Sequence, residues 1–252
     1  MTRLLKLTLI ALFVLLPTFA LAQDVGPLNI NVGDDLLSSQ RIFQMIILMT
    51  VLSIAPSILI MVTSFTRIVI VFSFTRNAMG LQNTPPNSVL VSLALFLTAF
   101  IMQPTLEAAY NNGVAPYLDN RLTEQEAFDQ TLNPFKKFMG AQVNEDDLNL
   151  FIGMLPEKDR PAKLENYADA PIRALIPAFM ISELKRAFEI GFLLFLPFLV
   201  IDLTVASILM SMGMMMLPPV IVSLPFKIIF FVLVDGWHLL SGSLVQSFNV
   251  VP

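Results

Sequence analysis

The chain has 252 residues, of which 56% are hydrophobic and only 13% are charged. Soluble domains carry roughly 25% charged residues, so the composition excludes an ordinary soluble domain and indicates an integral membrane protein. The formal net charge is −4 and no basic stripe with interleaved aromatic residues occurs, which argues against nucleic acid as a partner. The chain has no cysteine, so it forms neither a disulfide nor a thiolate metal site.

Residues 1–22 have the pattern of a cleavable signal peptide. Arg3 and Lys6 precede an apolar run, and Ala20 and Ala22 frame a small-residue cleavage site. The alternative is an uncleaved first membrane helix, but the apolar run is short for the roughly 20 residues that a span requires. We therefore expect cleavage, followed by a short polar segment over residues 23–41.

Residues 42–104 are predicted to form a first helical hairpin. Its two apolar helices cover Ile42–Val62 and Val89–Met102, and a Thr-Pro-Pro-Asn turn signal precedes the second. No acidic residue occurs in the hairpin, whereas Arg67 and Arg76 lie between the helices. The positive-inside rule therefore predicts that this end of the hairpin faces the cytoplasm.

Residues 105–175 form an acidic insert, with twelve acidic and seven basic residues and hence a net charge of −5. We expect it to face the periplasm. Helices are predicted from about residue 124, after a capping-box signature at Thr123, and from about residue 145, after Asn144. About 70 residues fold only marginally alone, so the insert is expected to mediate self-association.

Residues 176–252 are predicted to form C-terminal helical hairpins with a methionine-rich loop. Their first apolar run, Ile190–Val222, is too long for one straight span, so it should bend or double back. The sequence offers four places for this, which are Pro197, Asp202, Gly213 and the Pro218–Pro219 pair. The predicted fold class is all-α, with proline-kinked helical hairpins that flank a small helical insert.

Four charged residues lie among apolar neighbours in the predicted membrane-type helices. A charge at the bilayer centre costs about 2.5 to 3.5 kcal/mol, so such residues should pair with one another, contact a partner subunit or face water. A proton relay is a further alternative. The residues are Arg67, Asp202, Lys227 and Asp235.

A second set of charges lies on one predicted helix at spacings of three and four residues, and we expect these side chains to neutralise one another along it. They are Glu183, Lys185, Arg186 and Glu189. Such a cluster indicates a solvated or interfacial helix end.

Five of the fourteen methionines fall within seven residues. Methionine is flexible and polarizable, so such a cluster either fills a gap between helices or forms a soft seal around something of changing shape. Glycine inside the run would let the chain bend at low steric cost. The run comprises Met210, Met212, Gly213, Met214, Met215 and Met216.

Enzyme motifs do not occur. The sequence has no H-E-x-x-H, P-loop or G-x-S-x-G pattern, and His238 is its single histidine. We therefore predict a non-enzymatic protein without catalytic residues, cofactor or metal site.

Two sequence patterns are similar to those of a known family. Residues 177–192 and 197–203, followed by the methionine run and the Pro218–Pro219 pair, resemble the FliP family of flagellar export proteins and their injectisome relatives. Residues 63–68 and 82–86 also look like family segments, so the resemblance covers residues 42–245. The signal peptide and the long acidic insert resemble the flagellar branch.

The resemblance implies a core subunit of the flagellar type III protein export gate, in the bacterial inner membrane at the flagellar basal body. Several copies would assemble with FliQ and FliR into a helical, closed pore that conducts unfolded flagellar proteins, alongside FlhA and FlhB. The methionine run would seal the narrowest part of this pore, and the hairpins would lie raised toward the periplasm. The isolated charges would be satisfied inside subunit interfaces.

Two functions from other classes remain open on the sequence alone. One is a proton-coupled small-molecule transporter that uses Asp202 and Asp235. The other is a secretion scaffold without a conducting path.

Overall fold

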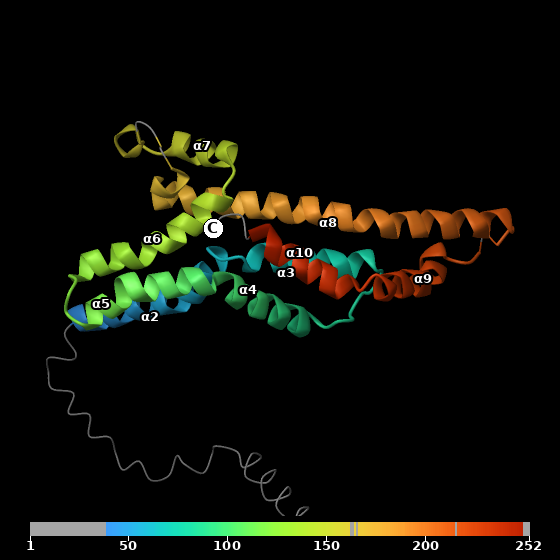
Figure 1. Ribbon diagram of the computed structural model, residues 1–252, viewed down its shortest axis with the longest axis horizontal. Coiled ribbons are helices and arrows are strands. Elements are labelled where there is room, and N and C mark those ends of the chain that lie inside the picture. The colour runs from blue at the N-terminus through green and yellow to red at the C-terminus, as the bar shows by residue number, and fades with distance from the viewer. Residues whose placement is uncertain (1–38, 162–163, 165, 215, 249–252) are drawn as a thin grey trace, which may run out of the picture. The chain divides into compact units, whose positions relative to one another are not determined.

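The computed structural model describes residues 39–161, 164, 166–214 and 216–248 (Figure 1). The signal peptide predicted for residues 1–22 lies outside them. In the described residues the regular elements are helices, without a strand, which confirms the predicted all-α class. They are α2 Ser39–Met61, α3 Phe65–Ala78, α4 Asn87–Ala109, a π-helical turn Tyr110–Val114, α5 Ala115–Leu118, α6 Glu124–Gln142, α7 Glu145–Met154, 3₁₀ turns Glu157–Asp159 and Tyr167–Asp169, α8 Ile172–Ser211, α9 Pro219–Leu233 and α10 Gly236–Phe248.

The chain divides into a unit of residues 1–53 and a unit of residues 54–252, and the packing described below is that of the second unit. Helix α3 lies at its centre. Side chains of α4, α8 and α10 pack against α3 and form the main apolar core, and Figure 1 shows α3, α8 and α10 running alongside one another. The fully buried members on α3 are Ile68, Val71 and Phe72.

Helix α8 has 40 residues and forms the longest element of the described chain. It continues through Pro177 and Pro197, so the chain does not double back at Pro197 or Asp202, two of the four predicted places. A proline removes one backbone donor, but the packing of α8 against α3 and α9 holds the helix together. The chain turns instead at Gly213, ahead of the Pro218–Pro219 pair, as two of the four predicted places indicate.

The insert shares its core with the start of α8. Buried residues of α6 and α7, including Met139, Val143 and Leu148, pack against Leu175 and Phe179 of α8. Because these apolar contacts join the insert to the membrane-type helix, the insert does not need an independent core. Its predicted self-association stays a prediction.

Both helix starts predicted in the insert are confirmed. Thr123 and Glu126 form the two reciprocal hydrogen bonds of a capping box at the start of α6. At the start of α7, the Asp146 backbone N–H donates to Asn144 Oδ1 at 3.0 Å. Each cap satisfies a backbone donor that the first turn of a helix leaves without an internal partner.

Within the residues that the structure describes, two helical stretches are long and apolar enough to cross a membrane, namely residues 87–118 and 172–211. Helices α9 and α10 meet at an angle of 60°, and they make a third candidate if the pair is one broken span. At this elbow Asp235 has a φ of +50°, and Gly236 lies so close to Phe231 that an added Cβ would stand 2.2 Å from its ring. The membrane-type composition inferred from the sequence is thus carried by a few long helices.

Candidate functional site

The methionine run forms the connection between α8 and α9. Its first turn is a Schellman motif, in which the Gly213 N–H donates to Met210 O at 3.1 Å and the Met214 N–H donates to Leu209 O at 3.0 Å. Gly213 has a φ of +74°, a conformation that strains any residue with a side chain. The glycine therefore ends α8 and turns the chain back toward α9.

The methionine side chains project into open space. Met210, Met212 and Met214 are 60%, 65% and 40% exposed, and Met216 is 98% exposed. Met215 lies outside the described residues. Side chains with this exposure do not fill a gap between helices of this chain, so the apolar surface of the run is left for another molecule or another copy to cover.

A partly buried ion pair holds the base of this hairpin together. Lys227 Nζ of α9 donates to Asp202 Oδ2 of α8 at 2.6 Å, and Ser223 Oγ donates to Asp202 Oδ1 at 2.6 Å. Lys227 also donates to the Ala78 carbonyl at the end of α3, at 3.3 Å. The pair therefore joins three helices behind the methionine run.

A second buried network lies at the other end of α8. The Arg67 guanidinium of α3 makes a two-point ion pair with the Glu183 carboxylate of α8, with Nε 2.8 Å from Oε2. Arg67 and Glu183 are 1% and 0% exposed. Paired guanidinium and carboxylate groups match in geometry and in charge, which offsets part of the cost of burying them.

The remaining donors of Arg67 are satisfied by two other helices. Its Nη1 donates to Ser247 Oγ of α10 at 3.0 Å, and its Nη2 donates to Gln142 Oε1 of α6 at 3.1 Å. The same amide oxygen accepts a hydrogen bond from Arg186 Nη1 at 2.8 Å. The Phe248 ring covers the guanidinium at 3.7 Å, within the range of a cation–π contact. We call these residues the Arg67 hub.

One charge prediction needs correction. Glu183 does not neutralise its neighbours along α8, because it is buried against Arg67 of another helix. Arg67, Asp202 and Lys227 have partners within this chain, and the pairing of Asp202 with Lys227 was one of the predicted alternatives. A role of these residues in a subunit interface stays a prediction. Asp235 is exposed at the elbow between α9 and α10.

The other charges of the second set are not buried either. Lys185 and Glu189 are exposed, and Arg186 is half-buried. A role of these residues and of Asp235 in an interface with another subunit stays a prediction.

Sequence reasoning missed the polar side chains that complete both networks. Gln142, Ser223 and Ser247 have no distinguishing spacing or neighbours in the sequence, and only the packing of distant helices brings them to a buried charge. In the part of the chain that the structure describes, no three His, Cys, Asp or Glu side chains gather as metal ligands.

Comparison with known proteins agrees with the resemblance seen in the sequence. The family model described as the FliP family matches residues 48–244. A flagellar biosynthetic protein FliP from Caulobacter vibrioides is 58% identical over 235 residues, which cover 93% of this chain and 86% of the relative. The protein of the same name from Bacillus subtilis is 50% identical, with 88% and 98% covered, and that from Aquifex aeolicus is 44% identical, with 90% and 93% covered. The chain therefore belongs to the FliP family of flagellar biosynthetic proteins.

Proposed function

We propose that this chain is a pore-forming core subunit of the flagellar protein export gate and that its methionine run seals the closed pore. The observation that carries the proposal is the exposed run at the tip of the α8–α9 hairpin, with Met216 98% exposed and Met212 65% exposed. Methionines gathered from several copies would form a dry constriction. Apolar constrictions block ions by expelling water, and flexible thioether side chains yield to a passing chain of any sequence.

The clamped base of the hairpin supports this role. The ion pair of Asp202 and Lys227 joins α8 to α9 behind the run. The helices that carry the methionines are therefore fixed relative to each other, while the methionine side chains remain exposed. A seal needs both properties. It must return to one closed arrangement, and it must deform without unfolding the subunit.

The assembly that we propose follows from the family. Several copies join FliQ and FliR in the bacterial inner membrane at the flagellar basal body, with FlhA and FlhB as further partners and unfolded flagellar proteins as cargo. The acidic insert faces the periplasm. Its contact with neighbouring copies would stabilise the ring.

The test is an ion-leak measurement on cells that assemble the complex. Replacing Met212, Met214 and Met216 together by serine should raise membrane conductance at rest, because hydroxyl groups retain water in the constriction. Met154 of α7 is a matched control, since it is 68% exposed but lies in the insert. An unchanged leak in the triple variant, with the complex still assembled, would count decisively against the seal.

The transporter alternative receives less support. Asp202 is already engaged by Lys227 and Ser223, and Asp235 is exposed, so the two carboxylates do not form a relay within the described chain. Single-channel recording of the purified complex distinguishes the pore from the remaining scaffold alternative, because a scaffold predicts no closable channel.

A further inference from the structure

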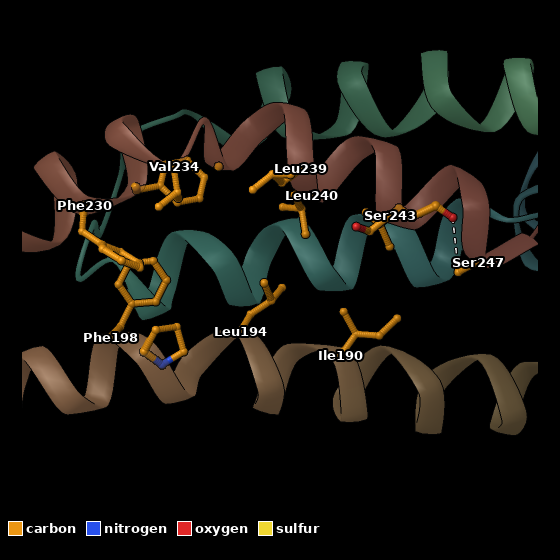
Figure 2. Close-up of a pocket in the computed structure, with 13 residues that line it drawn as sticks. Ile190, Leu194, Phe198, Phe230, Val234, Leu239, Leu240, Ser243 and Ser247 are labelled. Carbon is orange, nitrogen blue, oxygen red and sulfur yellow. Dashed lines mark hydrogen bonds between the residues drawn. The ribbon is translucent and has the colours of Figure 1, made fainter.

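Two cavities next to the Arg67 hub differ in chemistry. The larger of the two is an apolar groove lined by side chains of α8, α9 and α10 (Figure 2). Its polar lining side chains are those of Ser243 and Ser247, and Ser247 Oγ already donates to Leu244 O at 2.7 Å. Among the described residues that line the groove, none carries a charge. The groove therefore offers nothing that would select a charged partner.

The other cavity is a pocket of about 290 Å³ that is lined by side chains of α4, α6 and α10. Phe138 and Phe248 give it aromatic surface, and its polar side chains are Thr105, Lys137 and Gln142. All three can donate a hydrogen bond, and one of them is a cation. We call this cavity the Lys137 pocket.

Gln142 brings a buried amide nitrogen to the Lys137 pocket. Its Oε1 accepts from Arg67 Nη2 at 3.1 Å and from Arg186 Nη1 at 2.8 Å. Both guanidinium groups only donate, so the amide oxygen faces them and the N–H₂ group points to the other side. Gln142 is 2% exposed, and its amide nitrogen has no hydrogen-bond partner among the described residues.

The amide nitrogen of Gln142 is not fully enclosed. In the described part of the chain, the enclosed side-chain polar atoms without a partner are Ser64 Oγ and Arg76 Nε, and the Gln142 nitrogen is not among them. It therefore keeps some accessible surface, which the pocket that Gln142 lines accounts for. An amide N–H₂ that is shut off from water without a partner costs free energy, so this nitrogen favours a hydrogen-bond acceptor in the pocket.

Lys137 sets the charge of that acceptor. Its side chain is exposed, and it makes no ion pair with any other described residue. A carboxylate has two oxygens that only accept, so it matches an ammonium group and an amide N–H₂ group at the same time. The hydrocarbon stem of a glutamate would rest on the aromatic surface of the pocket. The chemistry of the pocket therefore suits a glutamate side chain.

We propose that the Lys137 pocket of one copy binds the Glu189 carboxylate of a second copy of this chain. The inference rests on the proposed assembly of several copies, but it concerns a contact beside the Arg67 hub rather than the methionine run. It gives a partner to one of the α8 charges for which a role in a subunit interface is predicted.

Glu189 lies on the outer face of α8. Ala187 and Gly191 are buried, and Glu189 is midway between them. Two residues correspond to about 200° around a helix of 3.6 residues per turn, so the Glu189 side chain points away from the core. It is exposed and makes no ion pair with another described residue. The carboxylate is thus presented to another molecule.

The surroundings of Glu189 match those of the pocket. Phe188 and Phe192, which lie before and after it on α8, are 53% and 65% exposed. Apolar side chains around a charge pair exclude water and so strengthen the attraction between the two charges. Contact between these rings and Phe138 of the pocket would cover apolar surface on both copies.

The two surfaces lie at nearly the same level along α8. Arg186 reaches Gln142 of the pocket, and Glu189 follows Arg186 by three residues, a rise of about 4.5 Å at 1.5 Å per residue. The pocket belongs to α4, α6 and α10, whereas Glu189 is on the outside of α8, so the contact joins two different surfaces. Such a head-to-tail contact repeats from each copy to the next and builds a ring or a helical assembly.

Zero-length crosslinking tests the contact in the purified, detergent-solubilised export complex. A carbodiimide joins a lysine amine to a carboxylate, with loss of water, only where the two groups touch. The expected product is a covalent dimer on a denaturing gel, in which mass spectrometry finds a peptide of Lys137 joined to a peptide of Glu189.

Conservative variants identify the two groups. Lys137→Arg keeps the charge but cannot couple, so it should abolish the dimer, whereas the neighbouring Lys136→Arg should retain it. Glu189→Gln should also abolish the dimer. Asp235→Asn is its matched control, because Asp235 is exposed as well and should not contribute. A dimer that survives both Lys137→Arg and Glu189→Gln would overturn the proposal.

Charge reversal tests whether the contact contributes to assembly. Lys137→Glu places two carboxylates opposite each other and should weaken the association of copies at least about tenfold, as measured by sedimentation of the purified complex. Adding Glu189→Lys should restore most of the association. Both positions are exposed, so neither change should unfold the subunit. A double variant that is not rescued would overturn the direct pairing.

The outcomes separate this contact from the proposed pore. A complex with several copies but no Lys137 crosslink would overturn the contact and leave the pore proposal standing. A Lys137 crosslink confined to one chain would show that the pocket is filled internally, and it would also overturn the contact. A complex that contains a single copy would refute the contact and the pore together.

Discussion

The two ends of α8 differ in how far their side chains are buried and in which groups they contact. Near its start, Glu183 is fully buried, and four helices contribute to the network around Arg67. At its end the methionines that the structure describes, Met210, Met212, Met214 and Met216, are 40% to 98% exposed. The difference separates two requirements on one helix. The Arg67 hub fixes how the helices pack, whereas the run offers soft apolar surface that the chain itself leaves uncovered.

This contrast predicts that changes at the hub act on stability and changes in the run act on conductance. The largest effect should come from Arg67→Met, which leaves the Glu183 carboxylate buried without its partner. Removing one member of a buried pair costs about 3 to 5 kcal/mol, because the remaining charge is neither paired nor hydrated. Thermal unfolding of the purified subunit measures the loss.

The exposed pair of Arg121 and Asp119 provides the control for that measurement. Its side chains are 69% and 57% exposed, so Arg121→Met should cost no more than about 1 kcal/mol. If the two variants were equally destabilised, the hub would not be the structural anchor that we infer.

An intermediate effect is expected at the base of the hairpin. Lys227→Met should cost about 2 to 3 kcal/mol, less than the hub variant because Asp202 keeps its Ser223 hydrogen bond and is 26% exposed. Adding Asp202→Asn should recover part of this loss, since the unpaired charge is then removed. Strictly additive losses in the double variant would contradict a direct pairing.

A substitution at Gly213 tests the backbone conformation of the methionine run without changing its methionine side chains. Gly213→Ala should cost about 1 kcal/mol, because alanine is strained at a φ of +74° while its Cβ would meet no atom within 4 Å. Gly153 of α7 is the matched control. It also has open space but lies in a helix, so Gly153→Ala should be neutral or stabilising by up to about 1 kcal/mol. The comparison uses unfolding of both variants, and a destabilised Gly153→Ala would contradict it.

The sequence predicted local structure better than it predicted long-range pairing. The capping signatures at Thr123 and Asn144 gave the starts of α6 and α7, because a cap depends on residues only a few positions apart. Apolar length predicted α2, α4 and the C-terminal helices, but not α3 as a helix of its own, and Gly213 was one of four places offered for a turn. The partner of Arg67 lies 116 positions away, and no spacing rule links Arg67 to Glu183.

The same limit explains why the sequence left four places open for the turn after Ile190. Proline and glycine mark possible bends from local geometry, whereas the continuity of α8 through Pro197 depends on its packing against α3 and α9. The methionine run could be found in the sequence because five of the fourteen methionines fall within seven residues.

The smallest expected effect lies outside the Arg67 hub and the methionine run, at the capping box that starts α6. The Thr123 backbone N–H donates to Glu126 Oε2 at 2.9 Å, and this bond, together with one from the Thr123 hydroxyl, holds the pKa of Glu126 below its ordinary value. A lowered pKa in the folded state means that the stabilisation is complete above the unfolded pKa of about 4.3 and is lost as the pH falls through the folded pKa.

Glu126→Gln should therefore flatten the pH dependence of the first turn of α6 in this acidic window, because glutamine does not titrate, and it should lower the protection of the turn at neutral pH, where the charged carboxylate stabilises it. Hydrogen exchange of the α6 amides, compared between variant and parent at each pH, measures this because the intrinsic exchange rates cancel. Thr123→Ala removes the two hydrogen bonds of the Thr123 hydroxyl, which donates to Glu126 Oε2 and accepts from the Glu126 N–H, but it keeps the backbone bond to Glu126. It should loosen the turn by about 1 kcal/mol at every pH above that window. The Arg67 hub does not depend on this cap, so neither variant should alter the exchange protection of the α3 and α8 amides. A change there would mean that the insert and the hub are coupled more strongly than the contrast between the two ends of α8 implies.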